Sequence, residues 1–262
     1  MERATERILP LFVTAICLVL ILPIAIVIVL AFSGQTFLKF PPDSYSLRWF
    51  AAFFGNARWQ ASLWSSVVIA VIACVIATAL GFFAAYAFVR HDFAGKKFLL
   101  SLMLLPIIVP TVITAIAMYF LSAKFGLVGN VLWIGACHAA LALPVVLLIL
   151  LSTLQGVDVN LERAALSCGS SWPRMMLRVV VPLAAPGIVS SALFAFLASF
   201  DELIVSLFLT NAATQTLPVR IWNSLHLEVE PTIAAVSAFL IAVTAAVLLL
   251  DRVLRGRRAA KA

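Results

Sequence analysis

Two adjacent carboxylates stand at the end of a long apolar stretch. Asp201 and Glu202 directly follow residues 179–200, which carry no charge. Acids within membrane-spanning segments are costly and usually mark a path for a ligand or an ion. Two carboxylates near the mouth of such a path would attract a cation, and the rings of Phe200 and Trp222 could stack against it. These four residues are predicted to line a cation pathway, unless the helix ends early and leaves the acids solvated.

Other side chains capable of chemistry are few. His138 is alone in the apolar run 131–153 and is interpreted as a hydrogen-bonded structural histidine rather than a proton relay. The 4 cysteines form no CxxC pair, so neither a disulfide framework nor a metal site is expected. The chain also lacks the HExxH and GxSxG motifs of hydrolases. The sequence therefore predicts no catalytic residue and no metal ligand.

The composition requires lipid as the main solvent of the chain. Hydrophobic residues make up 64% of the 262 residues and charged residues only 11%, whereas a soluble domain carries about 25% charged residues. About 20 apolar residues cross the hydrocarbon core as a helix, and the first run is too long for a signal peptide. We predict an all-α integral membrane protein with one transmembrane domain, residues 1–262. Its six helices are expected at residues 8–32, 61–89, 98–122, 131–153, 184–209 and 232–250.

The basic residues set the expected orientation. With both termini in the cytoplasm, most of the 18 Lys and Arg residues fall on the inner side, as the positive-inside rule requires. The basic tail formed by Arg255, Arg257 and Arg258 is interpreted as an anchor of this topology, because no nucleic-acid-reading fold surrounds it. Nucleic acid is therefore not an expected partner, and membrane lipid is.

Three local patterns add detail to this plan. Residues 33–60 form a long outer connection rich in aromatic residues, for which an interfacial helix is expected. Pro106 and Pro110 are expected to kink the third helix. Gly81 and Gly187 are expected to permit close packing between helices.

A second long connection, on the predicted inner side, contains signals for two short helices. Asp158 or Asn160 can cap the start of the first helix, and Gly169 suits the left-handed residue that ends one. Ser171 and Pro173 then suit the start of a second helix. The small side chains of the first helix would let another backbone approach closely, so the helix could dock into the groove of a partner or lie on lipid.

This connection, residues 157–182, resembles the EAA loop of ABC importer permeases, whose pattern is Glu-Ala-Ala, three residues, Gly and a distal Ile-x-Leu-Pro. Ala164 and Ala165 match the alanines, Gly169 the glycine, and residues 180–182 the distal element approximately. Arg163 stands where the family has its acid, and Glu162 supplies an acid one position earlier, about 100° away around a helix. The resemblance implies a type I importer permease fold with a cytoplasmic coupling helix between helices 4 and 5. It also implies that Glu162, Arg163, Ala164, Ala165 and Gly169 contact an ATPase subunit, although the altered acid leaves the family's salt bridge open.

Further stretches resemble the C-type subunit of polyamine permeases, namely residues 199–206 and 216–222, followed by Pro231. That resemblance implies a bacterial inner membrane location and a putrescine or spermidine substrate. It also implies three partners: a second homologous permease, a cytoplasmic ATPase dimer and a periplasmic solute-binding protein. The chain has no GxxxxGK[ST] motif, so no cofactor is expected in it, and ATP and Mg would be bound by the ATPase.

Two alternatives remain at the level of sequence. A permease of the same family could carry another small solute, such as an opine, an amino-acid-like compound or an aminophosphonate. Alternatively, Asp201, Glu202 and His138 could carry protons in a self-sufficient secondary transporter. The two halves of the chain lack the clear repeat of broken helices that many such transporters show, which favours the importer.

Overall fold

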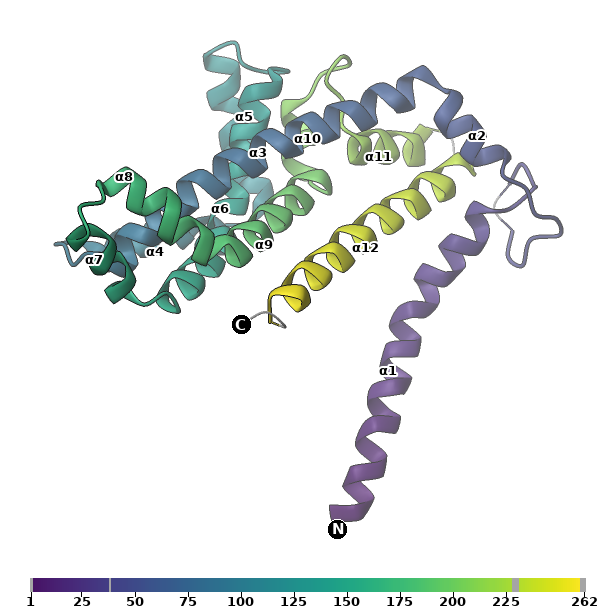
Figure 1. The fold of residues 1–262 in the computed structure, drawn as a ribbon. Coiled ribbons are helices and arrows are strands. Elements are labelled where there is room, and N and C mark those ends of the chain that lie inside the picture. The colour runs from purple at the N-terminus through teal and green to yellow at the C-terminus, as the bar shows by residue number, and fades with distance from the viewer. Residues whose placement is uncertain (1, 38, 228–230, 260–262) are drawn as a thin grey trace. The chain divides into compact units, whose positions relative to one another are not determined.

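The structure is a computed structural model, and it describes residues 2–37, 39–227 and 231–259. These residues form helices and connecting loops, and among them only an isolated bridge between Ser33 and Tyr45 has β character. Figure 1 shows the helices in chain order. Their bounds are α1 (Glu2–Ala31), α2 (Arg48–Gly55), α3 (Ala57–Arg90), α4 (Lys96–Ile108), α5 (Thr111–Lys124), α6 (Val131–Gln155), α7 (Val159–Ser167), α8 (Trp172–Met175), η1 (Met176–Val180), α9 (Val181–Phe200), α10 (Ile204–Leu209), α11 (Leu217–Leu227) and α12 (Thr232–Ala259).

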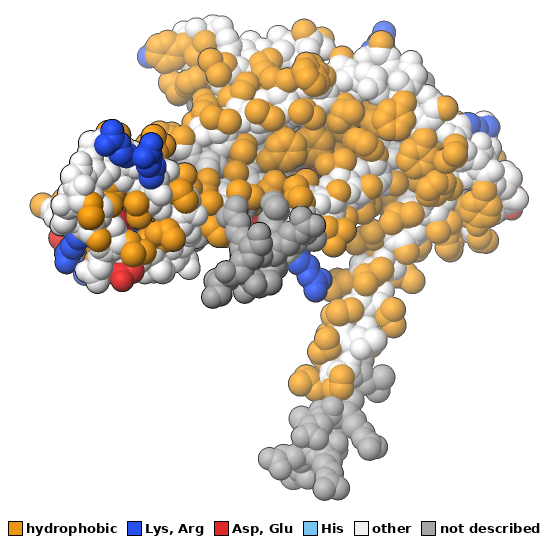
Figure 2. All heavy atoms as spheres, in the orientation of Figure 1, with side chains coloured by type: hydrophobic (Ala, Val, Ile, Leu, Met, Phe, Trp, Pro, Cys, Tyr) orange, Lys and Arg blue, Asp and Glu red, His pale blue; other side chains and the backbone are white. Residues whose placement is uncertain are grey.

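Five helical stretches of the described residues are long and apolar enough to cross a membrane. They are Phe12–Ala31, Ala57–Arg90, Val131–Gln155, Trp172–Phe200 and Thr232–Arg252. A sixth candidate is the pair α4 and α5, which is bent by 102°. Hydrophobic side chains cover most of the visible surface in Figure 2, whereas Lys and Arg gather in a few places. Such a surface suits lipid rather than water, in agreement with the composition.

The chain divides into two compact units. The larger unit comprises residues 61–219 and 246–262, and its core is formed by α3, α6 and α9. Glycines permit close packing here: a Cβ on Gly81 would come within 2.6 Å of Val146, and one on Gly187 within 2.0 Å of Thr153. The expectation that both glycines serve helix packing is thus confirmed.

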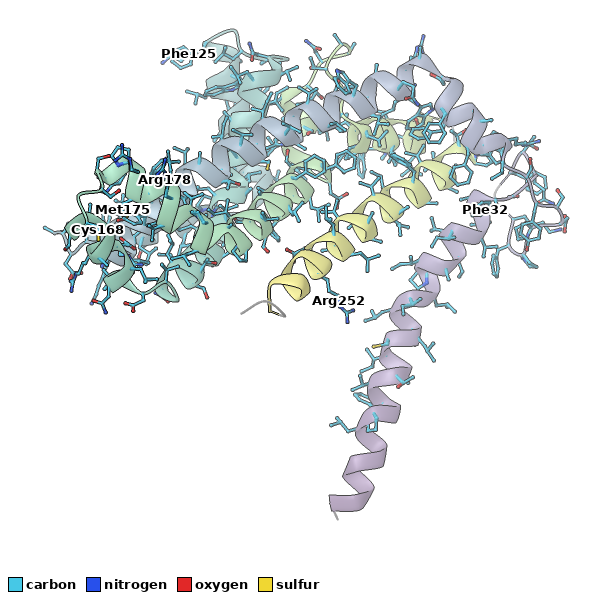
Figure 3. The ribbon with its side chains drawn as sticks, viewed as in Figure 1. Phe32, Phe125, Cys168, Met175, Arg178 and Arg252 are labelled. Atoms are coloured by element: carbon cyan, nitrogen blue, oxygen red, sulfur yellow. The ribbon has the colours of Figure 1, made fainter. Side chains whose placement is uncertain are left out.

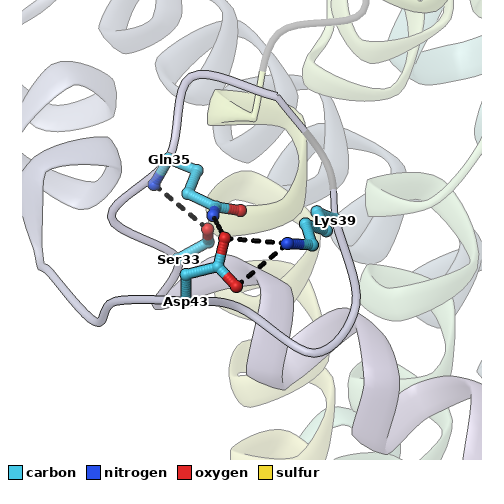
Figure 4. A network of polar contacts seen from close by, with 4 residues as sticks. All are labelled: Ser33, Gln35, Lys39 and Asp43. Carbon is cyan, nitrogen blue, oxygen red and sulfur yellow. Dashed lines mark hydrogen bonds and ion pairs between the residues drawn. The ribbon is translucent and has the colours of Figure 1, made fainter.

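The smaller unit comprises residues 1–60 and 220–245. Its loop before α2 is tied by a polar network in which Gln35 donates to Asp43 and Lys39 forms an ion pair with Asp43 at 2.9 Å (Figure 4). The hydrogen bond from Lys39 holds the pKa of the Asp43 carboxyl below its usual value. The helix that follows, α2, is the short helix expected between residues 33 and 60, and its Phe53 packs against Phe239 with ring centroids 5.4 Å apart.

Two helices that were expected to be continuous are broken. The expected helix 98–122 ends at Ile108 and restarts at Thr111, because Pro110 forces Val109 into an extended conformation with ψ 130°. The expected helix 184–209 stops at Phe200 and restarts at Ile204 as α10. This second break contains no proline, so a local sequence signal for it is missing.

The polypeptide enters α9 through a widened turn, η1. Pro182 lacks a backbone donor and crowds the carbonyl four residues earlier, at Arg178. A π-turn at residues 176–180 gives that ring room without ending the helix. The expected helix 184–209 therefore begins earlier than its apolar pattern indicates, and it is continuous with α8 at residue 172.

Candidate functional site

The segment 157–182 folds as its sequence predicts. The Asp158 carboxylate caps α7 by accepting from the backbone N–H of Asn160 at 2.9 Å, and Gly169 ends the helix with φ +83°. Ser171 precedes α8. Figure 3 shows Cys168, Met175 and Arg178 on this segment. The predicted sequence of a short helix, a sharp turn and a second helix is confirmed.

One face of α7 is open. Arg163 and Ala164 are exposed, as is Gly169 in the turn, and Ala165 is half-buried against the core of the larger unit. A Cβ built on Gly169 meets no atom within 4 Å, so the positive φ and not lack of space demands a glycine there. Leu161 and Leu166 of α7 are also exposed, at 47% and 43%, so the open surface of this helix combines small residues, two leucines and one guanidinium.

Glu162, by contrast, points into the protein. Its carboxylate is only 6% exposed and forms an ion pair with Arg90 at 2.7 Å. The Tyr86 hydroxyl donates to its other oxygen at 2.8 Å, and the second arm of the Arg90 guanidinium donates to the Val157 carbonyl at 2.7 Å. Of the five residues predicted to face an ATPase, Glu162 is thus the one that the structure places inside the larger unit.

The two acids of the predicted pathway lie at the break between α9 and α10. Asp201 is exposed and ends α9. Glu202 is half-buried, and its carboxylate accepts from the Val205 amide at 2.8 Å, which caps the start of α10. Asp201 is therefore the more accessible carboxylate, and Glu202 also has a structural task.

The two aromatic residues of the predicted pathway differ in position. Phe200 is 3% exposed and stacks on Phe196 with ring centroids 5.5 Å apart, so its ring contributes to packing. Trp222 belongs to the smaller unit and is 41% exposed. Its ring lies 4.5 Å from that of His226. Within each unit, the structure leaves the Trp222 ring, and not the Phe200 ring, open to a ligand.

His138 bridges the break beside the acids. Its ring is 1% exposed and contacts the Ser199 hydroxyl of α9 at 2.8 Å and the Ser206 hydroxyl of α10 at 3.2 Å. A neutral imidazole has one donor and one acceptor nitrogen, and a hydroxyl fills either role. The interpretation of His138 as a hydrogen-bonded structural residue is in accord with these contacts.

The contacts of Glu162 and His138 define two polar clusters, one of Tyr86, Arg90 and Glu162 and one of His138, Ser199 and Ser206. The sequence had not indicated four of these residues as functional: Tyr86, Arg90, Ser199 and Ser206. Tyr86 and Arg90 are four positions apart on α3, so they share a helix face, and a basic residue that ends an apolar helix was interpreted only as a topology signal. The serines gave no signal, because hydroxyls within apolar helices commonly bond to their own backbone. Among the described residues, no group of three or more His, Cys, Asp or Glu side chains could hold a metal ion.

The comparison with known families identifies this arrangement. The family described as "Binding-protein-dependent transport system inner membrane component" matches residues 77–259, a range that contains both clusters and the 157–182 segment. The chain belongs to this family.

Curated relatives of the chain are permease proteins. It is 27% identical over 230 residues to the spermidine/putrescine transport system permease protein PotC of Escherichia coli K12, covering 88% of this chain and 87% of the relative. It is 31% identical over 188 residues to the trehalose transport system permease protein SugB of Mycobacterium tuberculosis, covering 71% of this chain and 68% of the relative. The permease role is thus common to relatives whose named solutes differ.

Solved structures share the fold. A chain of a bacterial ABC transporter involved in the import of the acidic polysaccharide alginate superposes with a TM-score of 0.75 at 13% identity, covering 97% of this chain and 96% of that chain. A chain of an amino acid ABC transporter gives a TM-score of 0.59 at 19% identity, covering 80% and 98%. The chain therefore has the fold of an ABC importer permease, multi-pass and helical.

Proposed function

We propose that this permease is one membrane subunit of an ATP-driven importer in a bacterial inner membrane. Residues 1–262 act as one transmembrane domain with six spans, the α4–α5 pair serving as the third, and with both termini in the cytoplasm. A second homologous permease, a cytoplasmic ATPase dimer and a periplasmic solute-binding protein complete the complex. ATP and Mg are bound by the ATPase, and this chain performs no catalysis.

The observation that carries the proposal is the open face of α7. An exposed short helix that presents small and apolar side chains can pack into the groove of a partner, and the buried Glu162 on the same helix anchors it to the rest of the larger unit. Arg163, Ala164 and Gly169 would contact the ATPase directly, and half-buried Ala165 would border that contact. Glu162 would not touch the ATPase but would hold α7 in place through its bonds to Arg90 and Tyr86 of α3.

The proposed solute is a small cation, a polyamine such as putrescine or spermidine. Two observations support this choice: the exposed Asp201 carboxylate beside Glu202 at a helix break, and the likeness to permeases named for spermidine and putrescine. The buried Phe200 ring would support the acids by packing within the larger unit. The exposed Trp222 ring, in the smaller unit, is a separate candidate for a cation–π contact. An opine, an amino-acid-like solute or an aminophosphonate is the alternative within the same family.

Coupling is tested by Gly169→Leu in the complex expressed with its ATPase. A bulky side chain at the exposed turn should lower co-purification of the ATPase and solute uptake by about tenfold, the effect of about 1.4 kcal/mol. Gly95→Leu is the matched control, because Gly95 has nearly the same φ, +81°, and also no neighbour within 4 Å of its Cβ. Equal effects of both substitutions would show strain alone and would remove the coupling assignment.

The solute class is tested in proteoliposomes that contain the complete complex. Asp201→Asn combined with Glu202→Gln should reduce uptake of labelled spermidine several-fold more than uptake of a neutral solute, because only a cation loses attraction. Asp43→Asn, an exposed acid of a different loop, is the control. Equal losses for both solutes would reject the charge-based role, and spermidine uptake by this chain alone without ATP would favour the secondary transporter.

A further inference from the structure

We propose that Tyr86, Arg90 and Glu162 form the link through which movement of α7 reaches α3, so that α3 is driven directly by the ATPase. The inference rests on the proposed function, because it assumes that α7 is the ATPase contact. It assigns positioning residues that act through α7 rather than by touching the solute or ATP.

The link holds α7 at two points. Arg90 binds the Glu162 carboxylate within α7 through Nε and the Val157 carbonyl just before α7 through its second arm. Tyr86 occupies the remaining carboxylate oxygen. A planar guanidinium with two fixed donors restricts orientation as well as distance, so α7 cannot pivot on α3 without breaking one of these bonds.

The environment of the link makes it stiff. The Arg90 and Glu162 side chains are 11% and 6% exposed, and charges shielded from water interact more strongly than they do at a surface. Tyr86 also meets the Trp172 ring at the start of α8, with centroids 6.3 Å apart. The end of α3 therefore contacts both short helices of the segment, and not α7 alone.

The link connects α3 to α7, two helices that are far apart in the sequence. Arg90 and Glu162 are 72 positions apart, whereas the backbone joins α7 only to α6 and, through the Gly169 turn, to α8. That backbone route changes direction at Gly169, whose φ is +83°. By contrast, α3 is a continuous helix of 34 residues, and its Phe82, Ala85 and Phe88 belong to the core shared with α6 and α9.

A two-point polar grip on a long helix is therefore the more direct route for a displacement of α7. Rigid helices joined by packed side chains and ion pairs carry coupling between distant sites. Weakening the link is therefore expected to lower the amount of solute imported per ATP hydrolysed. The ATPase would still dock on the open face of α7, but only part of its movement would reach α3.

The test measures solute imported per ATP hydrolysed by the complete complex in proteoliposomes. Glu162→Gln keeps the shape but removes the charge, and it should lower this ratio by about tenfold, the equivalent of about 1.4 kcal/mol for a charge-assisted hydrogen bond. Tyr86→Phe removes one bond and should lower the ratio about threefold. Tyr119→Phe on α5, an exposed tyrosine away from the link, is the control and should leave the ratio unchanged.

Rescue separates a link from a merely structural role. Exchanging the charges, Glu162→Arg with Arg90→Glu, should restore part of the ratio lost in either single variant. If Glu162→Gln does not fold, Arg90→Lys replaces it, because lysine keeps the charge but loses the fixed second arm to Val157. A parallel fall of hydrolysis and uptake, with an unchanged ratio, in these variants would overturn the inference.

The outcome is distinct from failure of the proposed function. If the ATPase does not co-purify with the unmodified chain, the proposed function fails before the link is tested. If the unmodified complex imports solute at the expense of ATP and the Tyr86, Arg90 and Glu162 variants keep its ratio, only the link is rejected.

Discussion

The larger unit contains two buried polar clusters that each join helices distant in sequence, but with different chemical groups. Tyr86, Arg90 and Glu162 join α3 to α7 through an ion pair. His138, Ser199 and Ser206 join α6 to both sides of the α9–α10 break through an imidazole and two hydroxyls. Both connect elements that are distant in sequence, and both lie beside a predicted functional segment, but only the first contains formal charges.

The two clusters differ in the groups that stay behind when one side chain is removed by substitution. Removing one partner of a buried ion pair leaves an uncompensated charge, and the cost includes the desolvation of that charge. Removing the imidazole from the second cluster leaves two serines on helices, which can turn back to a carbonyl of their own preceding turn. The charged cluster is therefore expected to be rigid and fragile, and the neutral cluster more tolerant.

The largest expected effect is that of Glu162→Ala. It leaves Arg90 buried without its anion and should destabilise the unit by about 3–5 kcal/mol, seen as a lower midpoint in thermal unfolding of the detergent-solubilised protein. Asp158→Ala, which removes only the cap of the same helix, should cost about 1 kcal/mol.

A double variant completes this experiment. Removing Arg90 as well, in Glu162→Ala with Arg90→Ala, should recover part of the loss, because residues that form one pair are not additive. If Glu162→Ala costs no more than Asp158→Ala, the ion pair is not the distinctive element of the charged cluster.

A smaller effect is expected for His138→Leu. Leucine fills much of the space, and the two hydroxyls lose their common partner, so the cost should be about 1–3 kcal/mol in the same unfolding measurement. His226→Leu, at an exposed histidine of α11, is the control and should change the midpoint little. A cost for His138→Leu as large as that for Glu162→Ala would mean that charge does not set the difference between the clusters.

The same contrast shows what the sequence could predict. Signals that act within a few residues were sufficient for α7: the Asp158 cap and the Gly169 turn gave its bounds to within one or two residues. Apolar runs located five long membrane-spanning helices, but not the breaks after Ile108 and Phe200 or the early start at Trp172. Pro110 gave an expected kink in the third helix, and the structure shows a full break of 102°. In each case the physical cause lies in the residue itself.

Signals that depend on distant partners were not visible. The break at residues 201–203 has no proline, and its polar contacts come from Glu202 locally and His138 on another helix. Glu162 was grouped with outward-facing residues, because its partner Arg90 is 72 positions away. Helix periodicity showed that Glu162 and Arg163 differ by about 100°, but it could not tell which of them faces the core.

The smallest expected effects separate the two serines of the neutral cluster. Ser199 lies 2.8 Å from the imidazole and Ser206 lies 3.2 Å from it, and a shorter hydrogen bond is generally the stronger one. Ser199→Ala should cost about 1 kcal/mol and Ser206→Ala about 0.5 kcal/mol, within the usual range for one neutral hydrogen bond. Ser101→Ala, an exposed serine of α4 that bonds to a carbonyl of its own helix, should fall within about 0.5 kcal/mol of no change.

When Ser199→Ala or Ser206→Ala is combined with His138→Leu, the losses should be less than additive, because the hydrogen bond between the serine and the imidazole is already absent. Additive losses would mean that the three side chains do not act as one cluster, and the break would then have to be held by the Glu202 cap.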